Sequence, residues 1–196
     1  GRVTDCSGRE FENISAFEYA LWALDKHMWT MMLDCLPKNE ESVKILAILL
    51  SQYDKVNTEG VTYTLNGKTI IEQHFDFENT IIKELQTQIS LINAIKDSGI
   101  NIYDEAREED VKAIAKHWCE NVGRAQKLLP RHVVDAYCSD EPFDPVPKFT
   151  SQPKSSTQIY NCFTKEYENW FQVNSKLGHD FAIYKSLGNR RVTGPY

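Results

Sequence analysis

"VTYTLNGKTI", residues 61 to 70, is the stretch that decides the fold class of this chain. Apolar and polar residues alternate along it, and a period of two is typical of a half-buried β-strand. Asn66-Gly67 is a dipeptide favoured in two-residue hairpin turns, because both turn positions need a positive φ. The stretch therefore predicts a β-hairpin, and segments with helical periodicity lie on both sides of it.

Two helices are predicted before the hairpin. Ser15 is a candidate N-cap for the first helix, which Pro37 ends, and the second runs over residues 40–53. The first helix carries one continuous apolar stripe, which we expect to be buried: Phe17, Leu21, Leu24, Met28, Met31, Met32 and Cys35. Methionine is flexible and polarizable, so we expect its side chains here to fill irregular space in the core.

Three further helices are predicted after the hairpin. They run from an Asn79 cap to Gly99, from the acidic run 104–110 to Gly123 or Leu129, and over residues 131–138 after Pro130. Acidic side chains stabilise the positive end of a helix dipole, and proline fits the first helical turn. The body of the protein is therefore predicted to be mainly helical.

The C-terminal part is predicted to be irregular and then β-structured. Residues 139–157 hold four of the seven prolines. The runs 157–164, 168–173 and 180–187 are rich in aromatic and β-branched residues and predict a small antiparallel sheet. The fold class is α+β, a mainly helical body with a β-hairpin insertion and a small C-terminal antiparallel β element.

Length and composition predict one compact domain over residues 1–196, because single domains commonly span about 100–200 residues. The hydrophobic fraction of 41% and charged fraction of 26% are ordinary for a soluble globular protein. No apolar run approaches the roughly 18 residues of a membrane span. The abrupt polar start and end suggest a fragment of a larger multidomain protein.

Charge and cysteine content exclude several classes of function. The net charge of −6 argues against DNA or RNA as a partner. The five cysteines are odd in number and widely spaced, which predicts neither a disulfide framework nor a zinc site. No basic-then-apolar N-terminal segment marks a Sec signal peptide.

Catalytic signatures are weak throughout the chain. The common phosphate-loop, zinc-protease and hydrolase motifs do not occur, so we predict no catalytic residue, no metal site and no cofactor. One remote alternative is a metal-dependent phosphodiesterase that uses the His179-Asp180 dipeptide. That dipeptide is predicted to lie in a turn, whereas the chemistry places it on a helix.

Four aromatic side chains are candidates for stacking on a flat ligand. They are Trp22 and Trp29 at the edge of the first helix, and Tyr53 and Tyr63 on either side of a polar loop. Exposed aromatic faces contribute about 1–3 kcal/mol per stacked base. Ordinary core packing is the alternative for each of them.

The local basic feature of the chain is "NVGRAQKLLPRHVVDAYC", residues 121–138. Arg124, Lys127 and Arg131 lie close together there and are candidates to bind a phosphate through charge-assisted hydrogen bonds. A solvated helix face balanced by the acidic run 104–110 is the alternative.

Several segments in order carry a resemblance to a known family: "FEYALWALDKHMWTMM", "HFDFENTIIKELQT", "HWCENVGRAQKLLPRHVVDAYC", "FDPVPKF", "IYNCFT", "WF" and "LGHDFAIYK". Together they resemble a module that recurs in type IV secreted effectors of intracellular bacterial pathogens, often beside ankyrin repeats. The chain is similar to the KLAMP-type nucleotide-binding domains of one such effector. The likeness runs from about Gly8 to Lys185.

The resemblance implies a non-catalytic module that binds an adenine nucleotide of the ADP or cyclic AMP class. It also implies delivery by a type IV system into the host cytosol. The first helical segment, with Gly8 upstream, resembles an ankyrin repeat as well, although a solenoid needs about three or more repeats. The alternative function is therefore a protein-interaction module related to ankyrin-type capping units, with a host protein as partner.

Overall fold

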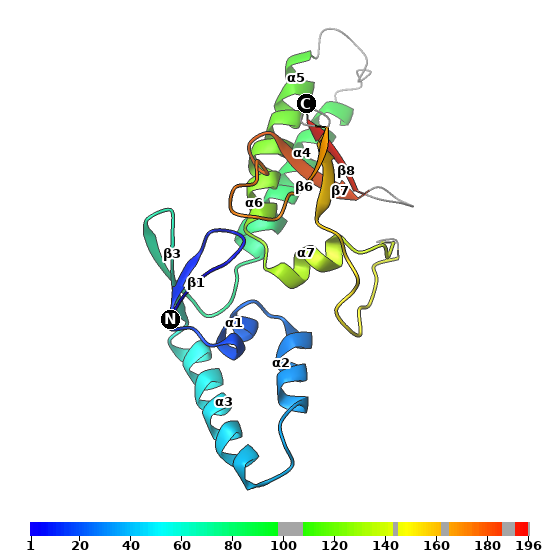
Figure 1. The fold of residues 1–196 in the computed structure, drawn as a ribbon. Coiled ribbons are helices and arrows are strands. Elements are labelled where there is room, and N and C mark those ends of the chain that lie inside the picture. Colours follow the sequence, from blue (N-terminus) through cyan, green and yellow to red (C-terminus); the bar gives the residue numbers. More distant parts are fainter. Residues whose placement is uncertain (98–107, 143–144, 162–164, 186–190, 196) are drawn as a thin grey trace. The chain divides into compact units, whose positions relative to one another are not determined.

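The computed structural model describes residues 1–97, 108–142, 145–161, 165–185 and 191–195. The chain divides into two compact units. The N-terminal unit comprises Gly1–Phe75 with Phe149–Gln152, and the C-terminal unit comprises Asp76–Lys148 with Pro153–Tyr196 (Figure 1).

A four-stranded antiparallel sheet forms one side of the N-terminal unit. Its order is β1 (Arg2–Thr4), β2 (Glu10–Glu12), β3 (Val61–Leu65) and β4 (Lys68–Glu72). The predicted hairpin is confirmed, since β3 pairs with β4 and the turn residues Asn66 and Gly67 have φ values of 51° and 75°. The sequence did not predict β1 and β2, because strands of three residues are too short for a period-two pattern to show.

Three helices complete the N-terminal unit: α1 (Ala16–Trp22), α2 (Lys26–Asp34) and α3 (Glu40–Thr58). The predicted cap is confirmed, because the Ser15 hydroxyl accepts a hydrogen bond from the Glu18 backbone nitrogen at 3.0 Å. The Glu18 carboxylate accepts in turn from the Ser15 backbone nitrogen at 2.8 Å, which completes a capping box.

The prediction of one continuous helix from Ser15 to Pro37 is wrong. The chain leaves the helix at Ala23 and turns at Leu24, whose φ is +57°. Asp25 then caps α2 by accepting a hydrogen bond from the Met28 backbone nitrogen at 3.0 Å. The expected buried stripe is therefore cut in two.

The two halves of that stripe differ in burial. Phe17 and Leu21 on α1 are buried, as expected. Met28, Met31 and Cys35 lie beyond the break and are exposed, so the expectation that the methionines fill the core is wrong for Met28 and Met31. The stripe was predicted for one straight helix. The turn at Leu24 changes the direction in which the side chains after it point.

Arg9 lies at the centre of the core of the N-terminal unit. Its guanidinium is 5.2 Å from the ring centroid of Trp22 and 5.1 Å from that of Phe75. The Asp5 carboxylate pairs with it at 3.2 Å and also accepts a hydrogen bond from the Arg9 backbone nitrogen. A buried cation of this kind needs both an opposite charge and ring faces to offset its desolvation.

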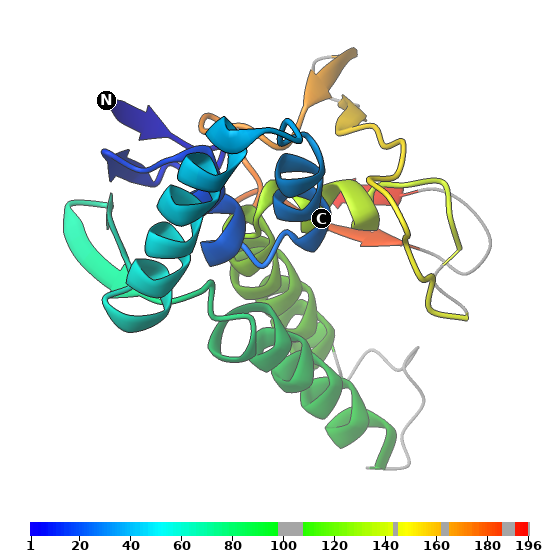
Figure 2. The same cartoon turned by 90° about the horizontal axis from the view of Figure 1, so that it is seen from below.

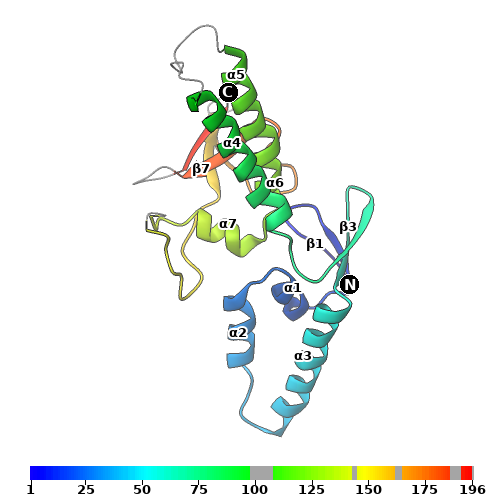
Figure 3. The same cartoon turned by 180° about the vertical axis from the view of Figure 1, so that it is seen from behind.

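Long helices run through the C-terminal unit. A π-helical turn, η1 (Glu78–Ile82), leads into α4 (Lys83–Asp97), and α5 (Glu108–His117) continues through η3 (Trp118–Val122) into α6 (Gly123–Lys127). Figures 2 and 3 show α4 and α5 side by side. The first helix begins earlier than predicted, since the Asp76 carboxylate accepts a hydrogen bond from the Asn79 backbone nitrogen.

The ends of these helices test part of the sequence prediction. The predicted end at Gly99 and most of the acidic run 104–110 lie outside the described residues. The second helix passes through Gly123 and ends near Leu129, one of its two predicted ends. The short helix after Pro130 is confirmed as α7 (Arg131–Tyr137).

Two separate antiparallel pairs form the β-structure of the C-terminal unit. They are β5 (Gln158–Asn161) with β6 (Glu166–Asn169), and β7 (Phe181–Lys185) with β8 (Arg191–Pro195). The sequence predicted one small sheet and did not predict β8. The α+β class, with a helical body, a hairpin and C-terminal strands, is confirmed.

The turn before β7 packs tightly against α6. A Cβ added to Gly178 would lie 2.6 Å from the Arg124 backbone nitrogen, and the φ of Gly178 is +78°. The side chain of Gln126 donates to the Ile183 carbonyl and accepts from the Ile183 backbone nitrogen at 2.8 Å. One buried amide side chain therefore satisfies both backbone groups of a buried strand residue.

Candidate functional site

An open apolar cavity of about 460 Å³ lies in the N-terminal unit between α2 and α3, and we call it the α2–α3 groove. Its lining residues are Phe17, Leu21, Leu24, Trp29, Leu33, Leu46, Leu49, Leu50, Tyr53, Val56, Asn57, Gln73 and His74. Cavities of about 300–1,000 Å³ with mostly apolar walls are typical of binding sites.

The helices around the groove explain its shape. Both α2 and α3 pack against α1, whose buried Phe17 and Leu21 form the floor. Figures 1 and 3 show α2 and α3 as two arms that diverge from α1 and are joined again by residues 35–39. The space between the arms is therefore lined by the inner faces of both helices.

Helical spacing places the walls of the groove. Trp29 and Leu33 are four residues apart and share one face of α2. Leu46, Leu50 and Tyr53 follow the i, i+4, i+7 pattern and share one face of α3. Each of these three α3 side chains is exposed, which is unusual for a stripe with core spacing.

Polar groups close one end of the groove. The Asn57 side-chain amide donates to the Tyr53 carbonyl at 2.8 Å, and the Gln73 amide donates to the Asn57 carbonyl at 2.6 Å. The bond from Gln73 ties the C-terminal end of α3 to the segment after β4. None of the lining residues, all of which lie in the described part of the chain, is a lysine or an arginine.

The four aromatic candidates fall into two groups. Trp29 and Tyr53 line the groove from opposite helices. Trp22 and Tyr63 are 0% and 5% exposed, and both donate hydrogen bonds to the Glu72 carboxylate, at 2.9 and 2.8 Å. Burial raises the pKa of Tyr63 to about 12, and its bond to Glu72 adds to the effect. These two rings therefore pack in the core of the unit.

The three basic candidates belong to the C-terminal unit. Arg124 donates to the Gly178 carbonyl at 3.2 Å, and Lys127 donates to the Val173 and Ser175 carbonyls at 3.1 and 2.8 Å. The structure brings these two cations together, where they hold the segment before β7.

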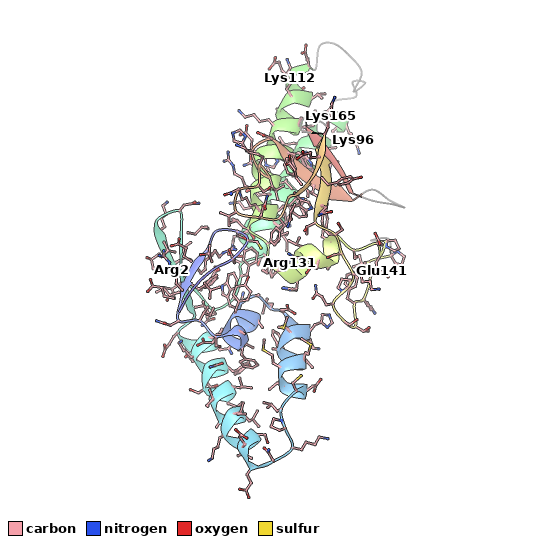
Figure 4. The ribbon with its side chains drawn as sticks, viewed as in Figure 1. Arg2, Lys96, Lys112, Arg131, Glu141 and Lys165 are labelled. Carbon is pink, nitrogen blue, oxygen red and sulfur yellow. The ribbon has the colours of Figure 1, made fainter. Side chains whose placement is uncertain are left out.

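Arg131, labelled in Figure 4, makes a different set of contacts on α7. Its Nε lies 2.9 and 3.0 Å from the two carboxylate oxygens of Asp135. Its guanidinium carbon lies 5.9 Å from the ring centroid of Phe171. All three predicted phosphate ligands therefore already hold groups of their own unit.

His179 and Asp180 lie in the turn before β7, as the sequence predicted, and their side chains are bonded to each other. The Cys119 thiol donates to the His179 carbonyl at 3.3 Å, and burial raises the pKa of that thiol. Within the described ranges, no three or more His, Cys, Asp or Glu side chains gather closely enough to hold a metal ion.

Two features of the N-terminal unit were missed from the sequence. Arg9 carries no signal, because a single arginine beside a turn reads as a surface residue. The groove has one signal: residues 43–50, "VKILAILL", are apolar on almost all sides of α3, which exceeds what one buried face requires. Among the described residues, no helix has the length and apolar content to cross a membrane.

The fold and the groove define a mixed α+β protein with an open apolar groove on its N-terminal unit. The chain belongs to the CBUA0006 C-terminal domain family, whose model matches residues 80–195. That match covers most of the C-terminal unit. It also includes residues 149–152, which belong to the N-terminal unit. No solved structure matches the chain.

A bacterial relative extends the comparison to the groove. The chain is 37% identical over 201 residues to an uncharacterized protein, CBUA0006, of Coxiella burnetii (strain RSA 493 / Nine Mile phase I). The alignment covers 99% of this chain and 56% of the relative. The N-terminal unit is thus shared with that relative, although all of it except residues 149–152 lies outside the family match.

Proposed function

We propose that this chain is a non-catalytic protein-interaction module that takes the apolar face of a partner helix into the α2–α3 groove. The observation that carries the proposal is the exposed stripe of Leu46, Leu50 and Tyr53, which faces Trp29 and Leu33 across open space. An amphipathic helix in an apolar groove is a recurrent mode of recognition, in which anchors repeat at i, i+3, i+4 and i+7.

Packing energetics favour an occupant of this kind. Fully burying one leucine contributes about 1.5–3 kcal/mol, so the exposed leucines of the two arms leave a large binding energy unused. A third helix laid between α2 and α3 would cover both walls at once and complete a small helical bundle. The apolar lining, with polar groups at one end, suits a helix whose apolar face contacts the floor of the groove.

A second candidate is an adenine nucleotide whose base is held between Trp29 and Tyr53. The observation in its favour is that two of the four predicted aromatics line the same groove from opposite helices. The resemblance to nucleotide-binding domains supports it as well. The absence of lysine and arginine from the lining leaves the phosphates without a charged partner at the groove, which is why we rank this candidate second.

We place this module in a type IV secreted effector that acts on a host protein in the host cytosol. The proposal is supported by the resemblance to effector modules and by the bacterial relative.

Fluorescence anisotropy tests the first candidate. A labelled set of leucine-faced amphipathic helices, differing in the charge of their polar face, is titrated with the wild-type chain. We expect saturable binding that is lost in Leu46→Asp and kept in Ile71→Asp, a matched change at an exposed position on β4. No saturable binding of any helix, or binding that Leu46→Asp leaves intact, would contradict the proposal.

Calorimetry with ADP, ATP and cyclic AMP separates the second candidate from the first. Saturable heat that disappears in both Trp29→Ala and Tyr53→Ala would establish base stacking in the groove. An absence of heat at millimolar nucleotide would end that candidate and leave helix docking untouched.

A further inference from the structure

We propose that the helix received by the α2–α3 groove is α3 of a second copy of this chain, so that the module forms a two-fold symmetric dimer. The inference rests on the proposed function and names the partner for the same surface. Three observations carry it: the exposure of α3, the charge of the two arms, and the apolar area that they leave uncovered.

The exposure of α3 makes it a suitable occupant as well as a wall. Val43 is 68% exposed and Ile48 is 57% exposed, and they point to different sides of the helix. A helix that is apolar nearly all round is normally covered nearly all round. Its stripe of Leu46, Leu50 and Tyr53 also has the spacing that groove-binding helices use.

A two-fold axis lets both roles be filled at once. In such an interface the same patch meets itself on the second copy. The Leu46 and Leu50 ridge of one α3 would cross the same ridge of the other, as helices do when i, i+4 rows interdigitate. With 19 residues, α3 extends about 28 Å, which is long enough to reach both arms of the second copy.

The charge of the arms permits self-association. Residues 25–58 carry five acidic and four basic side chains, a net charge of −1, whereas the whole chain carries −6. Two copies of an acidic chain repel each other least where their surfaces are nearly neutral. At the tip of the arms, Lys38 and Lys44 lie on either side of the acidic pair Glu40 and Glu41 in the sequence, so each can meet an opposite charge on the second copy.

The two arms leave several large apolar side chains uncovered. The largest apolar patch on a typical monomer is about 300–600 Å². Six large apolar side chains on the two arms are exposed, namely Leu33, Val43, Leu46, Ile48, Leu50 and Tyr53, and four of them (Leu33, Leu46, Leu50 and Tyr53) line the groove. A stable interface buries about 800 Å² on each partner, so the dimer would bury polar residues at the rim of the arms together with these apolar side chains.

Sedimentation analysis of the full chain tests the inference. From low to several hundred micromolar protein, we expect a concentration-dependent species of about twice the monomer mass of 22.6 kDa. Leu46→Asp should shift that equilibrium to monomer by at least tenfold in dissociation constant, while the control Ile71→Asp should leave it unchanged. Circular dichroism and thermal unfolding of each variant verify that it is folded.

The outcomes separate the dimer from the underlying function. A monomer at every concentration overturns the dimer, and so does a dimer that Leu46→Asp leaves intact. A monomer that still binds an amphipathic helix overturns the dimer alone, whereas a monomer that binds no helix overturns both proposals. If the dimer forms, the helix and the second copy should compete, so apparent helix affinity should fall as protein concentration rises.

Discussion

The guanidinium of the buried Arg9 lies 5.2 Å from the ring centroid of Trp22, inside the core of the N-terminal unit. Tyr63 and Phe75 complete the ring of aromatics around the cation, and Asp5 supplies the opposite charge. This arrangement explains why two of the predicted stacking rings are unavailable to a ligand. It also makes the core of this unit depend on one charged residue.

Replacing Arg9 should therefore destabilise the protein strongly. In Arg9→Met the Asp5 carboxylate stays buried without its partner, and we expect a loss of about 3–5 kcal/mol in the free energy of unfolding. Urea denaturation measures it. Arg2→Met is the control, because Arg2, labelled in Figure 4, forms an exposed ion pair with Glu10 that should contribute at most about 1 kcal/mol. Equal losses in the two variants would contradict the role of Arg9.

Glu18 should make stability depend on pH. Burial raises the pKa of its carboxyl, but the hydrogen bonds from Lys55 and the Ser15 backbone outweigh it and hold the pKa below 4.5. Because the folded-state pKa is lowered, the contribution is complete above the ordinary pKa of glutamate and is lost as pH falls through the folded value. Glu18→Gln should thus be less stable than wild type at pH 7, and the difference should shrink in acid. A difference that is constant with pH would contradict this.

Gly178 and Gly67 offer a matched pair of substitutions at positive φ. Alanine at Gly67 meets no atom within 4 Å, so Gly67→Ala should cost only the backbone strain of about 1–2 kcal/mol. Alanine at Gly178 also meets the Arg124 backbone, so Gly178→Ala should cost a further 1–3 kcal/mol or so. Thermal unfolding of both variants measures the difference. Similar melting temperatures would mean that α6 yields to the added methyl group.

Gln126 should be essential to the packing of β7 on α6. In Gln126→Met the buried backbone nitrogen of Ile183 loses its partner, at a cost of about 1–3 kcal/mol, whereas the Ile183 carbonyl keeps the hydrogen bond from the Tyr137 hydroxyl at 2.9 Å. Hydrogen exchange of the Ile183 amide should accelerate by a matching factor. An unchanged exchange rate would show that another group replaces the amide.

Local chemistry determined the parts of the fold that the sequence predicted well. The Asn66-Gly67 turn, the Ser15 cap and the helix after Pro130 each depend on the conformational preference of one or two residues. Such preferences act between near neighbours, so they can be read without knowing the rest of the molecule. The α+β class follows from them.

The candidate site was only partly predictable. Trp29 and Tyr53 were named from the sequence and both line the groove, although the same reasoning also named Trp22 and Tyr63, which are buried. Whether an aromatic residue at the edge of an apolar stripe is buried or exposed depends on which residues pack against it. For Trp22 that neighbour is Arg9, which is distant in sequence.

Local preference and composition account for the caps, the hairpin turn, most of the helices and the acidic balance of the chain. The break of the first helix at Leu24, the enclosure of Arg9 by rings and the exposed apolar stripe of α3 depend instead on how the unit packs. A left-handed turn at a leucine and a buried cation are both unfavourable alone, and only the contacts of the folded unit offset them.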